Sequence, residues 1–253
     1  MSVTLRRWLF FPAVLVMAAL LVWGLAGVPP FGQEHSVYAD KLNHVTVAER
    51  HVTNVVAAVT FDYRGFDTLG EEFILFTSVI GATVLLRQLN DEEKATTPDE
   101  AANRQVPPNS DAVRSLTLGL IGPLAVFALY LIAHGHTSPG GGFQGGAVLA
   151  TALLLVYLAG NVDLFQGATS HALMEGLETL GLGAFVLLGL AGLVIGAGFL
   201  ENVLPLGQAK AVTSGGHIPL LNVATGLAVG AGLVLLFKSF LEQTLELRRD
   251  GEA

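Results

Sequence analysis

Long apolar stretches alternate with short polar segments along this chain. Crossing the hydrocarbon core of a bilayer takes about 20 mostly apolar residues in a helix. Six stretches come close to that length: residues 8–27, 68–86, 115–133, 143–160, 179–200 and 218–237. The pattern therefore predicts an all-α fold, a polytopic transmembrane helical bundle of about six spans.

A seventh apolar stretch, residues 44–61, has a different pattern. Its valines and alanines recur at helical spacing, but Glu49, Arg50 and His51 lie near its middle. A crossing buries these side chains in lipid, whereas a helix lying at the membrane surface keeps them in contact with water. The stretch therefore predicts an interfacial amphipathic helix.

Lysines and arginines are distributed unevenly between the loops. If the N-terminus is inside and the amphipathic helix does not cross, nine of them are cytoplasmic and four are outside: Lys41, Arg50, Arg64 and Lys210. If that helix crosses, the bias reverses. The positive-inside rule favours the first arrangement. We predict a multi-pass protein of the cell (inner) membrane, with both termini cytoplasmic and residues 140–142 outside.

The composition excludes several classes of function. The chain is 52% hydrophobic and 13% charged, at a mean hydropathy of +0.59, which is typical of a membrane-embedded protein. The absence of cysteine excludes disulfides, thiolate metal sites and cysteine nucleophiles. A net charge of −8 argues against a nucleic-acid partner. We expect no enzyme activity and no cofactor.

A polar segment divides the sequence into modules. Residues 91–111 contain six acidic residues and three prolines, a composition typical of a solvated linker. This cytoplasmic linker separates a module of two spans, residues 1–90, from a module of four spans, residues 112–240. A polar tail, residues 241–253, follows.

The segment from Phe61 to Glu72 leads into the second predicted span. It allows a structural interpretation, in which Thr68 and Glu71 form a capping box and Asp62 pairs with Arg64. It also allows a functional interpretation, in which Glu71 and Glu72 handle protons in the first turn of a membrane helix. The residue types leave both open.

Residues 134–146 are dense in glycine. Pro139 fixes one backbone angle and the next three residues, all glycine, permit conformations that other residues avoid, which predicts a non-helical turn between the third and fourth spans. His134 and His136 have the spacing of a metal chelate, but no further ligand accompanies them. We interpret them as polar boundary residues and predict no metal site.

Two acidic residues, Glu175 and Glu178, lie at the start of the fifth predicted span, one turn after His171. Such residues usually complement the helix dipole, and the alternative is a vestibule that attracts cations. The pairs Gly192/Gly196 and Gly226/Gly230 predict close helix packing.

The glycine-rich segment and the charged segment before the second span both resemble parts of one known family of complexes. Residues 135–146 resemble the signature loop of the MnhB/MrpB subunit of Mrp-type multisubunit sodium/proton antiporters. Residues 62–71 are similar to the MbhE-like segment at the C-terminal end of the large antiporter subunit, which is a separate subunit in membrane-bound hydrogenases. The first likeness covers roughly residues 112–240 and the second roughly residues 1–90.

The resemblance implies a noncatalytic membrane subunit of a complex that exchanges cytoplasmic Na+ for external H+. Its implied partners are other antiporter-complex membrane subunits, Na+, H+ and the lipid bilayer. The signature acidic position of the family falls on Glu71. Because no lysine lies within a span of this chain, the resemblance places the main proton channel in a partner subunit. The candidates for ion transfer are Glu71, Glu72, Asp67, Glu175 and Glu178, and the signature loop comprises Pro139, Gly140, Gly141, Gly142 and Phe143.

Two alternative functions stay open. One is a subunit of a hydrogenase-like or other respiratory complex. The other is a metal-dependent intramembrane enzyme that uses Glu71, Glu72, His134 and His136.

Overall fold

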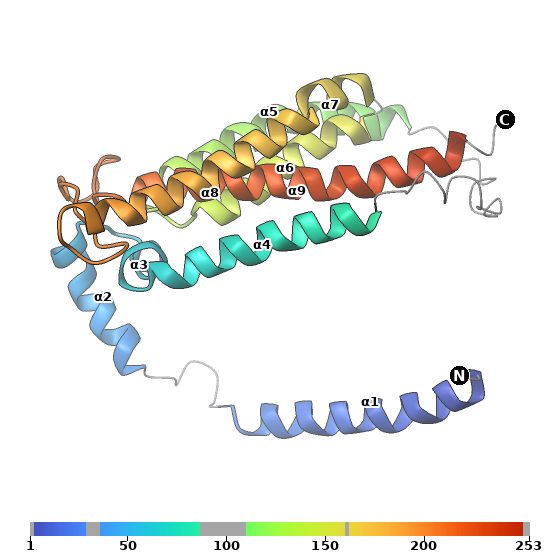
Figure 1. Ribbon diagram of the computed structural model, residues 1–253, viewed down its shortest axis with the longest axis horizontal. Coiled ribbons are helices and arrows are strands. Elements are labelled where there is room, and N and C mark those ends of the chain that lie inside the picture. Colours follow the sequence, from blue (N-terminus) through green and yellow to red (C-terminus); the bar gives the residue numbers. More distant parts are fainter. Residues whose placement is uncertain (1–2, 29–35, 87–109, 160–161, 250–253) are drawn as a thin grey trace. The chain divides into compact units, whose positions relative to one another are not determined.

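The regular structure is helical throughout the part of the chain that the computed structural model describes, residues 3–28, 36–86, 110–159 and 162–249 (Figure 1). Most of the predicted linker and the last four residues of the predicted tail lie outside these ranges. The chain forms two compact units, Met1–His44 and Val45–Ala253.

The first unit contains helix α1, Val3–Ala26, and the beginning of α2, Val37–Arg50. Apolar side chains such as Trp8, Leu15 and Trp23 lie on the surface of α1. A helix that is apolar all around fits lipid, in agreement with the first predicted span.

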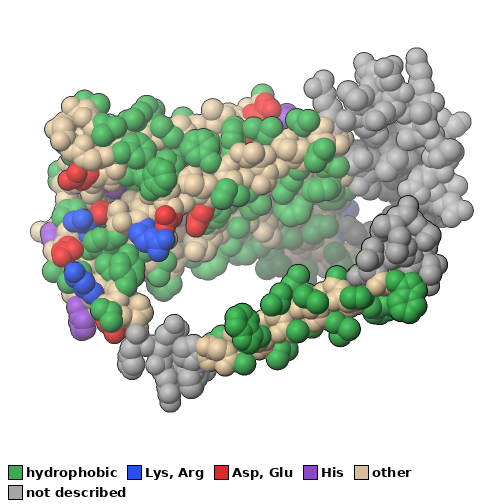
Figure 2. All heavy atoms as spheres, turned by 60° about the horizontal axis from the view of Figure 1, so that its bottom comes forward, with side chains coloured by type: hydrophobic (Ala, Val, Ile, Leu, Met, Phe, Trp, Pro, Cys, Tyr) green, Lys and Arg blue, Asp and Glu red, His purple; other side chains and the backbone are tan. Residues whose placement is uncertain are grey.

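The second unit is a bundle built around one central helix, α9, Ile218–Arg249 (Figure 1). Around it pack α4 (Gly65–Leu86), α5 (Asp111–Ala133), α6 (Gly142–Leu158) and α8 (His171–Val194). Three short elements complete the unit: α3 (Val55–Ala58), the π-helix η1 (Val59–Tyr63) and α7 (Val162–Ala168). On the face in Figure 2, hydrophobic side chains cover most of the helical surface and most charged ones lie toward one end.

Glycines allow these helices to approach α9 closely. A Cβ atom added to Gly146 of α6 would lie 2.9 Å from both the Gly226 carbonyl oxygen and the Gly230 nitrogen. The predicted packing role of Gly226 and Gly230 is therefore confirmed, with the contact made inside this chain. The role predicted for Gly192 and Gly196 is wrong, because α8 ends at Val194 and Gly196 lies in a turn with φ +82°.

Each of the six predicted apolar stretches lies largely in a helix, but several boundaries differ. The fifth helix begins at His171 rather than residue 179, and the sixth continues to Arg249. Four helical segments are long and apolar enough to cross a membrane: Gly65–Leu86, Asp111–Ala133, Leu164–Val194 and Ile218–Leu241. The segments Phe10–Ala26 and Gly142–Leu158 are apolar but shorter, so six crossings remain a prediction.

The single helix predicted over residues 44–61 is wrong, and the position of this segment at the membrane surface stays a prediction. Helix α2 ends at Arg50, and His51 has φ +55°, which breaks the helix before α3 and η1. Val52 and Phe61 are buried against residues of α8 and α9 rather than lying on lipid. The apolar pattern of this segment therefore reflects protein core.

Residues 45–86 pack directly onto the C-terminal helices. Phe61 and Leu69 share one core with Phe185 of α8 and with Leu221 of α9. In three dimensions the boundary between compact units lies at His44, within α2. The division of the sequence into modules 1–90 and 112–240 stays a prediction.

Candidate functional site

Two carboxylates meet inside the bundle. Glu72 of α4 is 3% exposed and Glu178 of α8 is 5% exposed. They line a common gap that is too small for a water molecule, together with Leu75, Phe76, Leu182 and Ala228. Two acidic side chains from different helices therefore share one dry, mainly apolar space.

Helix α9 forms the third wall around these carboxylates. A Cβ at Gly232 would lie 2.7 Å from the Glu178 Oε1 atom. Only glycine at this position therefore provides enough space for the carboxylate. The Thr225 hydroxyl faces Glu72 without reaching hydrogen-bond geometry. The Oε1 atoms of both glutamates have no hydrogen-bond partner among the described residues.

This environment dictates what the pair can do. An ionised carboxylate without water or a donor is costly in an apolar interior. A proton or a cation that neutralises Glu72 or Glu178 removes this cost. The arrangement therefore suits an exchange site that takes up one positive charge at a time.

The other acidic candidates lie elsewhere. Glu71 is exposed on the outer surface of α4, although it is next to Glu72 in sequence. Asp67 pairs with Arg64 on the surface, and the Glu175 carboxylate lies 3.1 Å from His171 Nδ1. The structure thus brings together Glu72 and Glu178 only.

Both structural predictions for the segment from Phe61 to Glu72 are wrong. The capping box fails because α4 already begins at Gly65, and the Thr68 hydroxyl donates to the Thr60 carbonyl at 2.6 Å. Asp62 does not pair with Arg64, since it accepts a hydrogen bond from Arg50 Nε at 2.7 Å.

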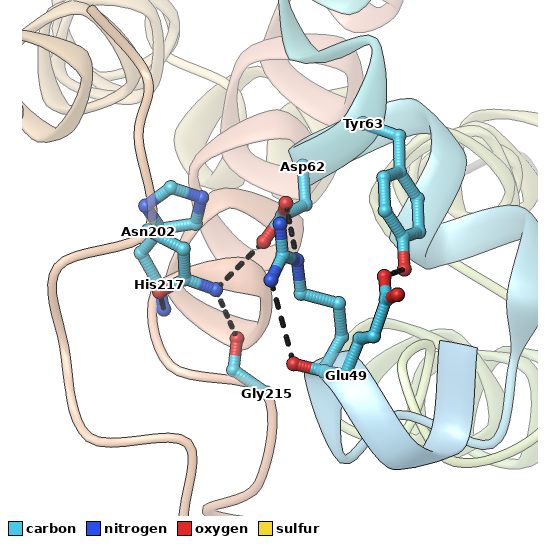
Figure 3. A network of polar contacts seen from close by, with 7 residues as sticks. Glu49, Asp62, Tyr63, Asn202, Gly215 and His217 are labelled. Atoms are coloured by element: carbon cyan, nitrogen blue, oxygen red, sulfur yellow. Dashed lines mark hydrogen bonds and ion pairs between the residues drawn. The ribbon is translucent and has the colours of Figure 1, made fainter. Parts of the chain in front are cut away.

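Asp62 belongs to a polar network at the end of the bundle that carries the loops (Figure 3). Its second oxygen accepts a hydrogen bond from Asn202 Nδ2 at 2.9 Å. Asn202 also donates to the Gly215 carbonyl and accepts from the His217 backbone N–H, both at 3.0 Å. The network joins η1, the loop 195–217 and the start of α9.

The signature loop lies at the same end and forms the predicted non-helical turn. Gly140 and Gly141 have φ values of +149° and +150°, a region that favours glycine. The Gly142 N–H donates to the Asn222 side-chain oxygen at 2.9 Å, and Asn54 Nδ2 donates to the Gly135 and Ser138 carbonyls. In this structure the loop joins α5, α6 and α9 to the segment before α3.

Sequence reasoning missed the asparagines Asn54, Asn202 and Asn222. Each holds a loop or a helix start through its side chain. Asn222 stands within an otherwise apolar span, which was the one signal available.

Two histidines at this end are buried. Burial lowers the pKa of His136 and of His217, although the Asp62 charge opposes the shift at His217. Within the described ranges, no three His, Cys, Asp or Glu side chains converge as a metal site would require.

Comparison with known proteins supports one family. Residues 112–235 match the domain family described as "Domain related to MnhB subunit of Na+/H+ antiporter". An uncharacterised protein of Methanocaldococcus jannaschii is 31% identical over 215 residues, which are 79% of this chain and 81% of that protein. The B subunit of the Na(+)/H(+) antiporter of Alkalihalophilus pseudofirmus is 32% identical over 94 residues, which cover 37% of this chain and 65% of that protein.

A solved structure extends the likeness over nearly the whole chain. One chain of the membrane-bound sulfane sulfur reductase, an archaeal respiratory membrane complex, is 34% identical with a TM-score of 0.70. The alignment covers 94% of this chain and 98% of that one. The long apolar helices of this fold define a multi-pass helical membrane protein. Residues 112–235 belong to the domain family related to the MnhB subunit of Na+/H+ antiporters.

Proposed function

We propose that this chain is a membrane subunit of a multisubunit Na+(cation)/H+ antiporter complex, with a role in both assembly and the ion pathway. Family membership supports the complex. The single structural observation that carries the ionic role is the pair Glu72 and Glu178, buried from two helices without hydrogen-bond partners for Oε1 among the described residues. Other membrane subunits of the complex are the proposed partners, and we propose no enzyme activity for this chain itself.

In this proposal Glu72 and Glu178 hold the exchanged charge inside the chain. Glu71, at the signature position, faces away from the bundle on α4. An acidic side chain on a lipid-facing surface is unfavourable, so a partner subunit covers Glu71 in the complex. Asp67 and Glu175 have surface ion-pair partners and are assigned structural roles.

We further propose that both termini are cytoplasmic and that the loop 195–217 lies outside. The absence of native cysteine makes single cysteines clean reporters. Ala112 and Thr213 are both exposed, near opposite ends of the bundle. An impermeant thiol reagent applied to intact cells should label Thr213→Cys and spare Ala112→Cys. The reverse labelling would refute this orientation.

The ionic role predicts a large effect of the double change Glu72→Gln/Glu178→Gln. Glutamine keeps the shape of both side chains but cannot take up or release a proton. We expect sodium-dependent proton movement in membrane vesicles to fall by about tenfold or more. The amount of assembled complex should stay at the wild-type level.

Glu175→Gln is the matched control, because it removes an exposed carboxylate from the same helix as Glu178. Its antiport should remain normal. Glu71→Gln tests the signature position separately. Normal antiport in the Glu72→Gln/Glu178→Gln complex would show that the buried pair does not carry exchanged ions.

The likeness to a chain of the sulfane sulfur reductase complex favours a second candidate, a subunit of a respiratory membrane complex. The two assignments differ in the partners that co-purify with the chain. Antiporter subunits support the first candidate, whereas redox subunits support the second.

A further inference from the structure

The structure assigns a proton entry route to this chain: protons reach Glu72 from a polar cavity beside Asp62, past His217 and across the apolar core that contains Phe61 and Leu221. This inference rests on the proposed function of the Glu72 and Glu178 pair and identifies the side from which it is loaded.

The cavity lies at the loop end of the bundle and has a volume of about 440 Å³. Arg50, Tyr63, Arg64, Glu201 and Asn202 contribute polar groups to its lining. The Asp62 side chain, also in the lining, is 5% exposed and ion-paired with Arg50. Two arginines offset the carboxylates of Asp62 and Glu201, so the lining has no excess negative charge to attract Na+, whereas hydrogen-bonded groups and water can pass a proton.

His217 directly precedes α9 and is a titratable group on which the Asp62 charge acts. Its side chain is 1% exposed, and its Nε2 atom has no hydrogen-bond partner among the described residues. Asp62 and Arg50 are the charged groups that act on it. Burial lowers the pKa of His217 and so favours the neutral imidazole, whose unprotonated ring nitrogen can accept a proton and pass it on.

Helix α9 connects His217 to the carboxylates. Leu221 and Thr225 follow at intervals of four residues, so they lie one and two turns further into the bundle. The Thr225 hydroxyl is fully buried, has no partner among the described residues and faces Glu72. The gap beside Glu72 is too small for a water molecule, so water reaches these unpartnered polar atoms only when the packing opens.

The route crosses the buried apolar core cluster to which Phe61 and Leu221 belong. Leu221 is fully buried, and Phe61 is 5% exposed and packs against Phe185 with ring centroids 6.2 Å apart. Phe61 belongs to the π-helix η1, and π-helical turns in proteins frequently occur at functional sites. Asp62, in the cavity lining, directly follows Phe61, so a shift of this turn changes the cavity and the core cluster together.

The transfer keeps charge and atoms in balance. A proton from cavity water adds to a ring nitrogen of His217, and the imidazolium then releases a proton to water that enters when Phe61 moves. The Glu72 carboxylate receives that proton and becomes a carboxylic acid. One positive charge has then moved inward, and His217 is neutral again.

The test uses the assembled complex in membranes and a single cysteine, Thr225→Cys, as a reporter. A small, positively charged methanethiosulfonate reagent applied from the loop side should modify this cysteine slowly. Adding Phe61→Ala should speed the modification by about tenfold or more. Phe165→Ala is the matched control, because Phe165 is equally buried but packs against Tyr157 in another part of the bundle.

Two further variants keep the test decisive. If Phe61→Ala prevents assembly, Phe61→Leu keeps an apolar side chain, removes the ring contact and should still speed the modification. His217→Gln should lower sodium-dependent proton movement by about tenfold or more at unchanged complex abundance. His136→Gln, which replaces another buried histidine off this route, should lower transport only in proportion to any loss of complex.

The outcomes separate this route from the proposed function. Unchanged modification of Thr225→Cys in both Phe61 variants, or normal transport in His217→Gln, would overturn the route. If Glu72→Gln/Glu178→Gln still abolished antiport in that case, the carboxylate pair would stand and its protons would arrive from another side.

Discussion

Replacing Gly142 by alanine should prevent accumulation of the folded subunit. A Cβ at this position would lie 2.7 Å from the Thr225 Cβ and 2.9 Å from the Gly226 nitrogen, and it would also meet the Asn222 carbonyl. These atoms belong to the central helix, whose backbone cannot move without displacing its other neighbours. Overpacking of this kind costs about 3 kcal/mol or more. The measurement is the amount of complex extracted in mild detergent, with its thermal unfolding midpoint.

Gly119→Ala is the matched control for Gly142→Ala. Gly119 is also a glycine in an apolar helix, but a Cβ there meets no atom within 4 Å. Alanine should leave stability unchanged or raise it by up to about 1 kcal/mol through its higher helix propensity. Equal yields of the two variants would contradict the close contact between α6 and α9.

Replacing Asp62 by leucine should produce the second large loss of stability. Arg50 Nε and Asn202 Nδ2 both donate to this carboxylate, and leucine leaves both without their acceptor. Breaking a buried ion pair by removing one partner costs about 3 to 5 kcal/mol. We expect the lower end, about 3 kcal/mol, because the Arg50 side chain is 33% exposed. Thermal unfolding of the purified complex measures the change.

Asp67→Leu is the control for Asp62→Leu. Its ion pair with Arg64 lies on the surface, where such pairs contribute about 1 kcal/mol or less. Asp62→Asn should fall between the two, because the amide keeps an acceptor for Arg50 without the charge. If Asp62→Leu is as mild as Asp67→Leu, the network at the loop end does not stabilise the fold.

The membrane-spanning character of this protein is determined by local sequence. A helix in lipid satisfies its own backbone hydrogen bonds, so an apolar run of sufficient length predicts both the helix and its surroundings. The runs containing α4, α5 and α9 were therefore found, and so was the turn at Gly140 and Gly141. The turn follows from the freedom of glycine backbones, which is a property of the residue itself.

The sequence could not show which acidic residues are buried, because this depends on the orientation of each helix and on the helices packed against it. Glu71 and Glu72 are adjacent in sequence, and only the packing of α4 on α9 turns Glu72 inward and Glu71 outward. Glu178 looked like a helix-start residue, but α8 begins at His171, which places Glu178 two turns into the helix. The gap shared with Glu72 joins residues more than one hundred positions apart, and no local pattern encodes it.

The sequence by itself determined that this protein is a helical membrane bundle with a non-helical glycine turn, because the length and apolarity of each run and the conformational freedom of glycine are local properties of neighbouring residues. The tertiary structure alone decided that Val52, Ala57, Ala58 and Phe61 belong to the core, that Asp62 pairs with Arg50 and that Glu72 meets Glu178. The contribution of an apolar or acidic side chain to stability depends on the groups that it contacts. In this chain those groups come from segments distant in sequence.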